Sequence, residues 1–430
     1  MDSEIIIHSR DVLFRISDAL DMLSPQLSQH QLRTAYIAWE LCKTLHLTEA
    51  IVDRVITASL IHDIGALTPE EKIDLHNFEE VDPEPHCVLG EYLLKDIHWL
   101  GACARLVRHH HRPWIIWQNQ LAPENEWIEP QIIFLADYIE RKINRNRFIL
   151  HQHTQIIEHV LTNSGYLFSP MLVEKFSTAS ISEGFWLELV SPQLYNHLQK
   201  KIPCNDILLS LEEFSRIGVL LRNIIDFRTP YTATHSSGVA QSALHLAKLC
   251  NFSEYDLQLM WVAGNLHDFG KVGIPTRILE KPGRLSTKEH AIMKQHAFFT
   301  YNILNGLHGF EQICDWAAFH HENLRGTGYP FRLAAENVPL GARIISVADN
   351  ITAMIEKRPY RSEMTDEQTR AILLFKSRRN YLDEHIVTLA MNNYEDIVGG
   401  IRKAQALAVE HYQMNFAPWI RYDGTGLKHE

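Results

Sequence analysis

Long apolar runs are absent from this sequence of 430 residues. Even the richest stretch, residues 217–227, is interrupted by Arg222, Asn223 and Asp226, so no segment approaches the ~20 apolar residues that a membrane helix requires. The first residues, MDSEIIIHSRD, also lack the basic start and apolar core of a signal peptide. We therefore expect a cytoplasmic protein that does not associate with membranes.

Cysteine pairs and excess positive charge are also missing. The six cysteines are scattered without CxxC spacing, which favours a reducing compartment over a disulfide scaffold. The net charge of -11 argues against binding to long nucleic acids, because such binding requires a dominant basic field. A small anionic ligand needs only a local group of cations and stays compatible with this charge. Histidine, by contrast, is abundant: its 25 copies exceed what packing usually needs.

The histidines reveal an internal repeat in a chain whose apolar residues mostly follow helical spacing. Each position of the second set lies 205 to 212 residues after its counterpart in the first. The first set is His30, His62, Asp63, His86, His110, His111 and Asp137, and the second is His235, His267, Asp268, His296, His320, His321 and Asp349. We predict an all-α fold of two tandem helical domains, residues 1–200 and 211–430, that arose by duplication.

The second set has the composition of a binuclear metal site. Five imidazoles and two carboxylates suffice for two ions if Asp268 bridges them, and ligation by N and O without thiolate suits Fe, Mn, Zn or Ni. Two ions about 3.5–4 Å apart would create a hydroxide at neutral pH that attacks phosphorus in line. Gly270 is expected to end the preceding helix in the left-handed conformation, and Thr234 to cap the helix that His235 opens.

The second half resembles the HD superfamily of metal-dependent phosphohydrolases, defined by a His…His-Asp…Asp pattern that His235, His267-Asp268 and Asp349 match. It is similar to the HD-GYP subgroup in particular, through HHENLRGTGYP (320–330), HDFGKVGIP (267–275) and RPYR (358–361). This resemblance implies hydrolysis of cyclic dinucleotides, most commonly cyclic di-GMP, to the linear dinucleotide and sometimes to mononucleotides. It also implies two divalent transition-metal ions, with Fe or Mn preferred and Ni or Zn as alternatives.

The resemblance further implies which residues do what. The first metal would use His235, His267, Asp268 and Asp349, and the second would use Asp268 with His296, His320 and His321. Lys271 is placed to contact a phosphate oxygen in the transition state. Substrate contacts are expected from the loop residues Gly328, Tyr329 and Pro330 and from two arginines, Arg358 and Arg361, that could instead be solvated surface residues.

Two positions depart from the family pattern. Tyr231 stands where some members have a glutamate associated with a third metal, so we predict a two-metal site. Arg325 stands where the signature usually has aspartate and is counted among the expected substrate contacts. A cation there could change base preference, which puts cyclic di-GMP specificity in doubt and keeps 3′,3′-cyclic GMP–AMP as a candidate.

The first half keeps the ligand types but loses the accessories. Ala66 stands at the position of Lys271, RHHHRPWIIWQNQ (108–120) replaces the Gly-Tyr-Pro loop, and His109 makes the histidine register ambiguous by one. Three interpretations stay open: a packing partner with vestigial histidines, a metal-bound regulatory domain without activity, and an independent hydrolase.

We therefore predict a metal-dependent cyclic-dinucleotide phosphodiesterase. An HD-type hydrolase of another nucleotide phosphoester is one alternative, and a non-catalytic signalling adaptor that binds cyclic dinucleotides is another. The predicted partners are the cyclic dinucleotide, with room for a homodimer and for signalling proteins, and neither long nucleic acid nor membrane.

Overall fold

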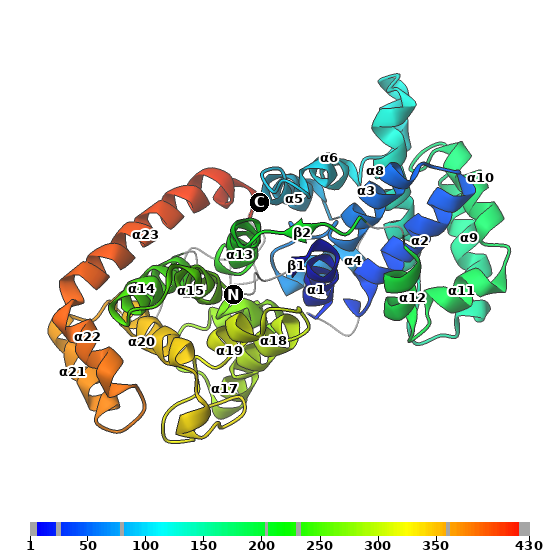
Figure 1. The fold of residues 1–430 in the computed structure, drawn as a ribbon. Helices are drawn as coiled ribbons and strands as arrows, with labels where there is room; N and C mark the ends of the chain where they lie inside the picture. Colours follow the sequence, from blue (N-terminus) through cyan, green and yellow to red (C-terminus); the bar gives the residue numbers. More distant parts are fainter. Residues whose placement is uncertain are drawn as a thin grey trace. The chain divides into compact units, whose positions relative to one another are not determined.

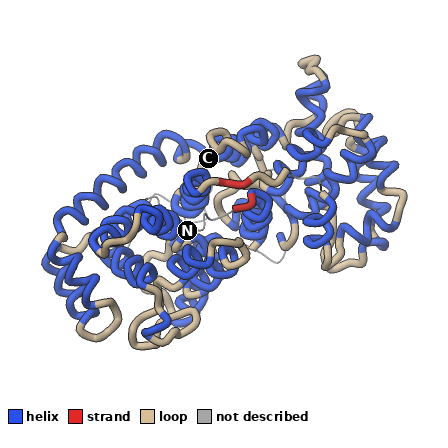
Figure 2. The backbone as a smooth tube through the Cα atoms, in the orientation of Figure 1, coloured by secondary structure: helices blue, strands red, loops and turns tan. Residues whose placement is uncertain are grey.

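The structure is a computed structural model that describes residues 7–22, 27–77, 81–202, 205–228, 234–357 and 362–420. Helices form nearly all of its regular structure, as Figure 2 shows, and the predicted all-α class is confirmed. The strands of the described part are two-residue segments, β1 (Ile7–His8) and β2 (Leu208–Leu209), which pair antiparallel with Ile7 opposite Leu209. In that same part, no helix combines the length and the apolarity needed to cross a bilayer.

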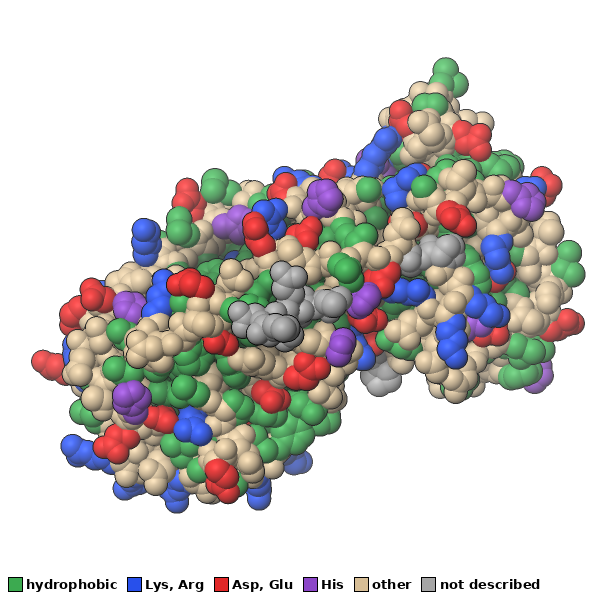
Figure 3. Space-filling view, viewed as in Figure 1, with side chains coloured by type: hydrophobic (Ala, Val, Ile, Leu, Met, Phe, Trp, Pro, Cys, Tyr) green, Lys and Arg blue, Asp and Glu red, His purple; other side chains and the backbone are tan. Residues whose placement is uncertain are grey.

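The chain separates into two compact units. The N-terminal unit comprises residues 12–66 and 71–207, and the C-terminal unit comprises residues 208–430 together with 1–11 and 67–70. The predicted division of roles between residues 1–200 and 211–430 stays a prediction. Lys/Arg and Asp/Glu side chains are interspersed over the face drawn in Figure 3, without a field of one sign.

The N-terminal unit is a helical bundle around α2, which packs against α3 and α8 (Figure 1). The buried residues of α2 include Leu32, Ile37 and Leu41, so the helix presents apolar surface to both neighbours. The helices are α1 (Ser9–Asp21), α2 (His30–Thr44), α3 (Glu49–Leu60), α4 (Pro69–Asn77), α5 (Glu84–Leu94), α6 (Gly101–His109), α7 (Trp114–Asn119), α8 (Glu124–Arg141), η2 (Ile149–His151), α9 (His153–Thr162), α10 (Pro170–Ala179), α11 (Glu183–Leu189) and α12 (Leu194–Lys201).

The C-terminal unit repeats this plan around α14, which packs against α15, α20 and α23. Small residues allow the close crossing of α14 and α15, because a Cβ added to Gly264 would lie 2.8 Å from the Cα of Ala240. The helices are α13 (Leu211–Asp226), α14 (His235–Leu249), α15 (Glu254–Leu266), η3 (Phe269–Gly273), α16 (Thr276–Leu279), α17 (Thr287–Met293), α18 (Gln295–Leu304), α19 (Glu311–Ala318), η4 (Ala335–Asn337), α20 (Leu340–Ile355), α21 (Asp366–Ser377), α22 (Glu384–Asn392), α23 (Tyr394–Asn415) and η5 (Ala417–Trp419).

Two local expectations need comment. Thr234 is the N-cap residue of α14, but its side chain makes no capping hydrogen bond. The expectation that Gly270 ends a helix in the left-handed conformation is wrong: α15 ends at Leu266, and Gly270 lies inside the 3-10 turn η3 without a positive φ. Its real constraint is space, since an added Cβ would lie 2.0 Å from the carbonyl oxygen of His296 and 2.6 Å from the backbone nitrogen of Thr300.

We expect Gly270→Ala to lower the free energy of unfolding by about 1–3 kcal/mol, because the extra methyl forces η3 and α18 apart. Gly399→Ala is the matched control, since Gly399 lies in α23 with no atom within 4 Å of an added Cβ. Its gain of helix propensity should raise stability by about 0.5–1 kcal/mol. Urea titration followed by circular dichroism measures both variants, and equal stability of Gly270→Ala and wild type would contradict this packing argument.

Candidate metal centre

The structure brings the seven predicted ligands of the second half together in one cluster, in which all but His321 and Asp349 are buried. They come from separate elements: His235 is the first residue of α14, His267 and Asp268 follow α15, and His296 lies at the start of α18. The remaining three are His320 and His321, which follow α19, and Asp349, which lies within α20. We call these seven residues the C-terminal cluster.

Asp268 lies between two groups of ligands. Its Oδ2 is 3.2 Å from His267 Nε2 and 3.6 Å from His235 Nε2, whereas its Oδ1 is 3.4 Å from His296 Nε2. The donor atoms of His235, His267 and Asp268 lie within 4.8 Å of one another, and so do those of His296, His320 and His321. The carboxylate therefore has the geometry to contact two ions, one on each oxygen.

Backbone carbonyls fix the direction of three imidazole rings. In each case Nδ1 bonds the carbonyl oxygen three residues earlier: His267 with Gly264 at 2.8 Å, His296 with Met293 at 2.7 Å and His320 with Ala317 at 2.6 Å. The opposite nitrogen, Nε2, is buried in all three rings and has no hydrogen-bond partner among the described residues. Buried polar atoms are normally paired, and metal-bound histidines usually have their second nitrogen fixed in this way. These rings fit metal ligation.

Sequence reasoning missed the two carboxylates that support α14. Glu356 Oε2 accepts a hydrogen bond from His235 Nδ1 at 3.0 Å, and Glu356 Oε1 accepts one from Gln405 at 2.7 Å. Asp226 accepts from the backbone nitrogen of Ser236 at 3.1 Å. A signal for Glu356 was present, because it follows Asp349 by seven residues, which is two helical turns, and therefore stands on the same side directly after the end of α20.

The electrostatics place Asp268 and the later histidines of the cluster in the ionisation state that metals require. Burial raises the pKa of Asp268, but the charges of Lys271 and His267 outweigh it and hold that pKa well below the usual range. Burial lowers the pKa of His296 to about 4 and that of His320 to about 3. His235 differs: burial lowers its pKa, but the nearby Glu356 and Asp349 outweigh burial and raise it to about 10. The carboxylates are therefore ionised and the later histidines neutral, which is the state that binds metals.

A cavity of about 410 Å³ opens onto the cluster. Lys271 and Tyr329 line it beside the ligands, and the Lys271 ammonium bonds Asp268 Oδ2. The ring of Tyr329 lies 4.6 Å from that of His321, and the Tyr329–Pro330 peptide is cis. Apolar walls are supplied by residues such as Ile278 and Met293. The cavity therefore combines a metal-binding floor, two lysines (Lys271 and Lys281) and the aromatic face of Tyr329.

The Gly-Tyr-Pro loop is organised by a further residue that sequence reasoning missed. Glu322 accepts hydrogen bonds from the backbone nitrogens of Phe331 at 2.7 Å, Arg332 at 3.0 Å and Leu333 at 3.1 Å. Gly328 lies against the backbone of Glu322, since a Cβ added to Gly328 would be 2.5 Å from the Cα of Glu322. The sequence gives one hint of this role, the adjacency of Glu322 to the two histidines.

The other predicted substrate contacts have varied positions. Pro330, Gly328 and Arg325 do not line the cavity within the described ranges, and the Arg325 guanidinium lies 4.8 Å from the centre of the Tyr381 ring. Arg358 and Arg361, and also Tyr231, lie outside the described residues. The roles of these residues in substrate binding stay predictions.

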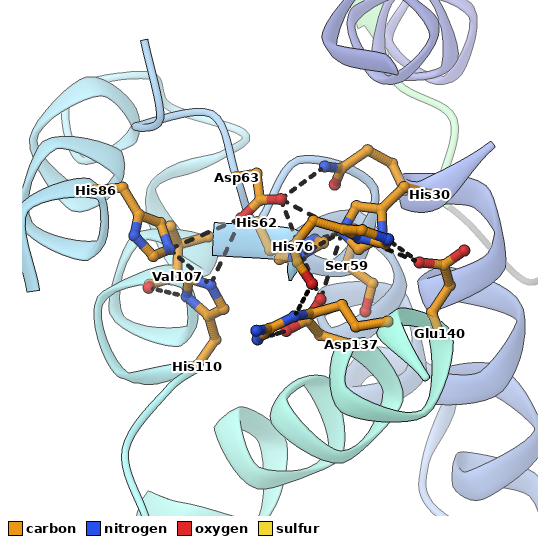
Figure 4. A network of polar contacts seen from close by, with 12 residues as sticks. His30, Ser59, His62, Asp63, His76, His86, Val107, His110, Asp137 and Glu140 are labelled. Carbon is orange, nitrogen blue, oxygen red and sulfur yellow. Dashed lines mark hydrogen bonds and ion pairs between the residues drawn. The ribbon is translucent and has the colours of Figure 1, made fainter. Parts of the chain in front are cut away.

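The N-terminal unit contains a second cluster built in the same way (Figure 4). Asp63 again lies in the middle: its Oδ2 is 3.3 Å from His30 Nε2, and its Oδ1 is 3.7 Å from His86 Nε2. His62 and His110 again bond carbonyl oxygens three residues earlier, at 2.9 Å and 2.6 Å. The N-terminal cluster is His30, His62, Asp63, His86, His110, His111 and Asp137.

The structure shows which two of the three consecutive histidines 109–111 lie in the N-terminal cluster. Donor atoms of His110 and His111 lie within 4.8 Å of those of Asp63 and His86, whereas the ring of His109 packs 5.5 Å from that of Trp117. Seven ligand-type side chains thus converge in the N-terminal unit as well.

The surroundings of the N-terminal cluster differ from those of the C-terminal cluster. Ala66 replaces the lysine, and Arg141 instead directs its guanidinium at Asp137, 3.4 Å away. Residues 114–119 form the short helix α7 where the other half has the Gly-Tyr-Pro loop, and Trp114 packs on Trp127 at 4.7 Å. The N-terminal unit thus has no lysine at the position equivalent to Lys271, where a cation could contact a substrate, although it keeps the residue types that ligate metals.

Comparisons with known proteins agree with this architecture. Residues 219–386 and residues 27–142 each match a family described as HD domain. The chain is 28% identical to 3′3′-cGAMP-specific phosphodiesterase 1 of Vibrio cholerae over 90% of its own length and 92% of that protein. It is 32% identical to 3′3′-cGAMP-specific phosphodiesterase 3 of the same organism, over 60% of this chain and 56% of that one.

Further matches include a cyclic di-GMP phosphodiesterase and a solved structure. The response regulator RpfG of Xanthomonas campestris is 33% identical over 43% of this chain and 50% of that protein. The crystal structure of the cyclic GMP-AMP specific phosphodiesterase V-cGAP3 of V. cholerae matches with a TM-score of 0.62 and 21% identity, covering 94% of this chain and 98% of that one, which shows a common fold. The chain therefore belongs to the HD-domain family, with one HD domain in each half.

Proposed function

We propose that the C-terminal HD-GYP domain hydrolyses 3′,5′-cyclic dinucleotides to linear dinucleotides. The observation that carries this proposal is the position of Asp268, which lies between two groups of ligands at the floor of a cavity that also contains Lys271 and Tyr329. The names of the relatives support the substrate class, since they are cyclic GMP-AMP and cyclic di-GMP phosphodiesterases.

HD-domain phosphohydrolases are metal-dependent, and the C-terminal cluster offers imidazole and carboxylate donors without thiolate. We propose two divalent transition-metal ions, with Fe or Mn favoured and Ni or Zn as alternatives. His235, His267, Asp268 and Asp349 would hold the first, and Asp268 with the later histidines would hold the second. Bound ions would supply an activated water and offset charge on the phosphate.

The chain's own residues supply the remaining functions. The Lys271 ammonium lies beside the shared carboxylate, from where it can donate to a phosphate oxygen as negative charge grows there. The Tyr329 ring faces the cavity beside His321 and offers a surface on which a base can stack. Burial keeps His296 and His320 in their neutral, metal-binding form near neutral pH.

We propose 3′,3′-cyclic GMP–AMP as the preferred substrate. Support comes from the relative that the chain matches over 90% of its length, which is named as specific for that molecule. Association with a second copy or with signalling proteins, and a cytoplasmic location, stay predictions.

Removing the shared ligand tests the active-site assignment. With Mn²⁺ or Fe²⁺, we expect His267→Ala and Asp268→Ala to lower turnover of cyclic dinucleotides more than about 100-fold, because even residues that only orient a metal ligand contribute about 10–100-fold. Chromatography of the linear product measures the rates. Equal rates for wild type and either variant would show that the reaction occurs elsewhere. Binding without turnover in wild type would favour a signalling adaptor, and turnover of other phosphoesters alone would favour another hydrolase.

Substrate preference has its own test. We expect wild type to have a higher kcat/KM for 3′,3′-cyclic GMP–AMP than for cyclic di-GMP. Arg325→Asp should change the ratio of the two values, because it replaces a cation by an anion near the Gly-Tyr-Pro loop. An unchanged ratio would exclude Arg325 from base selection, and a preference of wild type for cyclic di-GMP would overturn the proposed substrate.

We propose that the N-terminal HD domain binds metal but does not catalyse this reaction, since its cluster keeps the ligands and lacks the lysine. His62→Ala/Asp63→Ala should lower the metal content of the full chain and leave turnover by the C-terminal domain intact. His267→Ala/Asp268→Ala should lower both metal content and turnover. Elemental analysis beside rate measurements compares the two pairs. Unchanged metal content in His62→Ala/Asp63→Ala would show that the N-terminal histidines are vestigial, and loss of turnover equal to that of the other pair would contradict a non-catalytic role.

A further inference from the structure

Arg228 is a fully buried cation that lies two residues beyond the end of α13. Its side chain is 1% exposed. The guanidinium donates to three backbone carbonyl oxygens: Nη1 to Lys271 at 3.0 Å and Ile274 at 3.4 Å, and Nη2 to Val272 at 2.8 Å. Burying a cation costs free energy unless hydrogen bonds compensate, and here most of the compensation comes from one short segment of backbone.

That segment carries the proposed catalytic lysine. Lys271 lies in η3, the 3-10 turn that follows His267 and Asp268 and packs against α18 and α13. Its backbone nitrogen bonds the carbonyl oxygen of Asp268 at 2.8 Å, and its ammonium bonds the carboxylate of the same residue. With Arg228 on its carbonyl oxygen, the residue is held at both its backbone and its side-chain end.

Stability alone gives a poor account of this arginine. Its Nε is buried without a hydrogen-bond partner among the residues described, and an unpaired buried donor lowers stability. An apolar side chain of similar volume would avoid that cost, but it could not bond the carbonyl oxygens of Lys271, Val272 and Ile274. Residues that break a local rule of stability in this way are expected where function requires them.

The internal duplication supplies independent support. Asp226 and His235 correspond to Asp21 and His30 at the constant offset of 205 residues, and both aspartates accept from the backbone nitrogen of the residue after the histidine. At the same offset, Arg228 corresponds to Leu23 and Lys271 to Ala66. The arginine and the lysine are therefore both present in one half of the chain and both replaced by apolar residues in the other. A residue needed only for the fold that the two halves share would be expected in both halves, and not only in the half that has the lysine.

We propose that Arg228 is a positioning residue, which holds η3 so that the Lys271 ammonium points at the phosphate site. This inference deepens the proposed function and rests on it. Arg228 acts through Lys271 and has no contact of its own with substrate, since it does not line the cavity within the described ranges. Its removal should impair the step in which Lys271 acts and leave metal binding largely unchanged.

A double-mutant cycle in the full chain tests this dependence. We expect Arg228→Gln to lower kcat about 10–100-fold with a smaller change in KM, because a displacement of about 1 Å at a catalytic group can cost about 100-fold. In a Lys271→Ala background, Arg228→Gln should cause no further loss. Metal content should equal that of wild type. Losses that multiply in the double variant would show that Arg228 acts independently of Lys271 and would overturn the proposal.

Two further variants control for structural effects. Arg370→Gln removes a guanidinium that also bonds a backbone carbonyl, that of Met391 at 3.2 Å. Arg370 is not among the described residues that line the cavity, so its small effect should be the same with and without Lys271. Arg228→Lys keeps a buried cation with fewer donors and should restore part of the lost kcat. If Arg228→Gln fails to fold, the cycle is run with Arg228→Lys, and the same multiplication of losses would count against the proposal.

Amide hydrogen exchange separates this inference from the proposed function. Residues 269–274 should exchange faster in Arg228→Gln than in wild type, while amides of α14 and α23 keep their rates, whether or not the protein turns over cyclic dinucleotides. Unchanged exchange across residues 269–274 would show that the arginine does not hold the turn. Faster exchange in a protein without turnover would retain its structural action on the turn and reject the proposed function.

Discussion

The C-terminal domain depends on one buried carboxylate, that of Asp268. The histidine nitrogens around it are too many for hydrogen bonds alone to satisfy them. Asp268 has histidine nitrogens at 3.2 Å, 3.4 Å and 3.6 Å around its two oxygens, and it also accepts a bond from Lys271. Carbonyl oxygens fix the outer nitrogens of three rings, so the inner nitrogens cannot turn away to find other partners. Such an arrangement is costly as a core and favourable as a metal site, because cations offset both the buried charge and the unpaired nitrogens.

The two halves of the chain show which features belong to the fold and which to the reaction. Both keep a central aspartate, carbonyl-anchored histidines and a glycine pressed against the next helix: an added Cβ would lie 2.0 Å from a histidine carbonyl oxygen at Gly65 as at Gly270. The first histidine of each set bonds a glutamate, Glu140 in one and Glu356 in the other. The lysine, the Gly-Tyr-Pro loop and the arginine behind the turn occur in the second half alone. The duplication therefore separates metal-site construction from substrate handling.

The sequence predicted the parts of this account that rest on chemistry repeated along the chain. The all-α class and the two sets of histidines could be read from periodicity and spacing, because only certain residue types bind metals. Supporting residues were harder to predict. Glu356 and Glu322 act through hydrogen bonds to a ring and to a loop backbone, and nothing in their residue type distinguishes them from surface glutamates. Gly270 was identified for the wrong reason, since its constraint comes from the backbone of α18 rather than from its own φ.

The central claim is that the seven side chains of the C-terminal cluster hold two cations on either side of Asp268. Anomalous diffraction from crystals of the full chain loaded with Mn²⁺ tests it most directly. The account predicts two peaks about 3.5–4 Å apart within that cluster, each nearer to a different oxygen of Asp268. A single peak there, or peaks bound only by other residues, would contradict it.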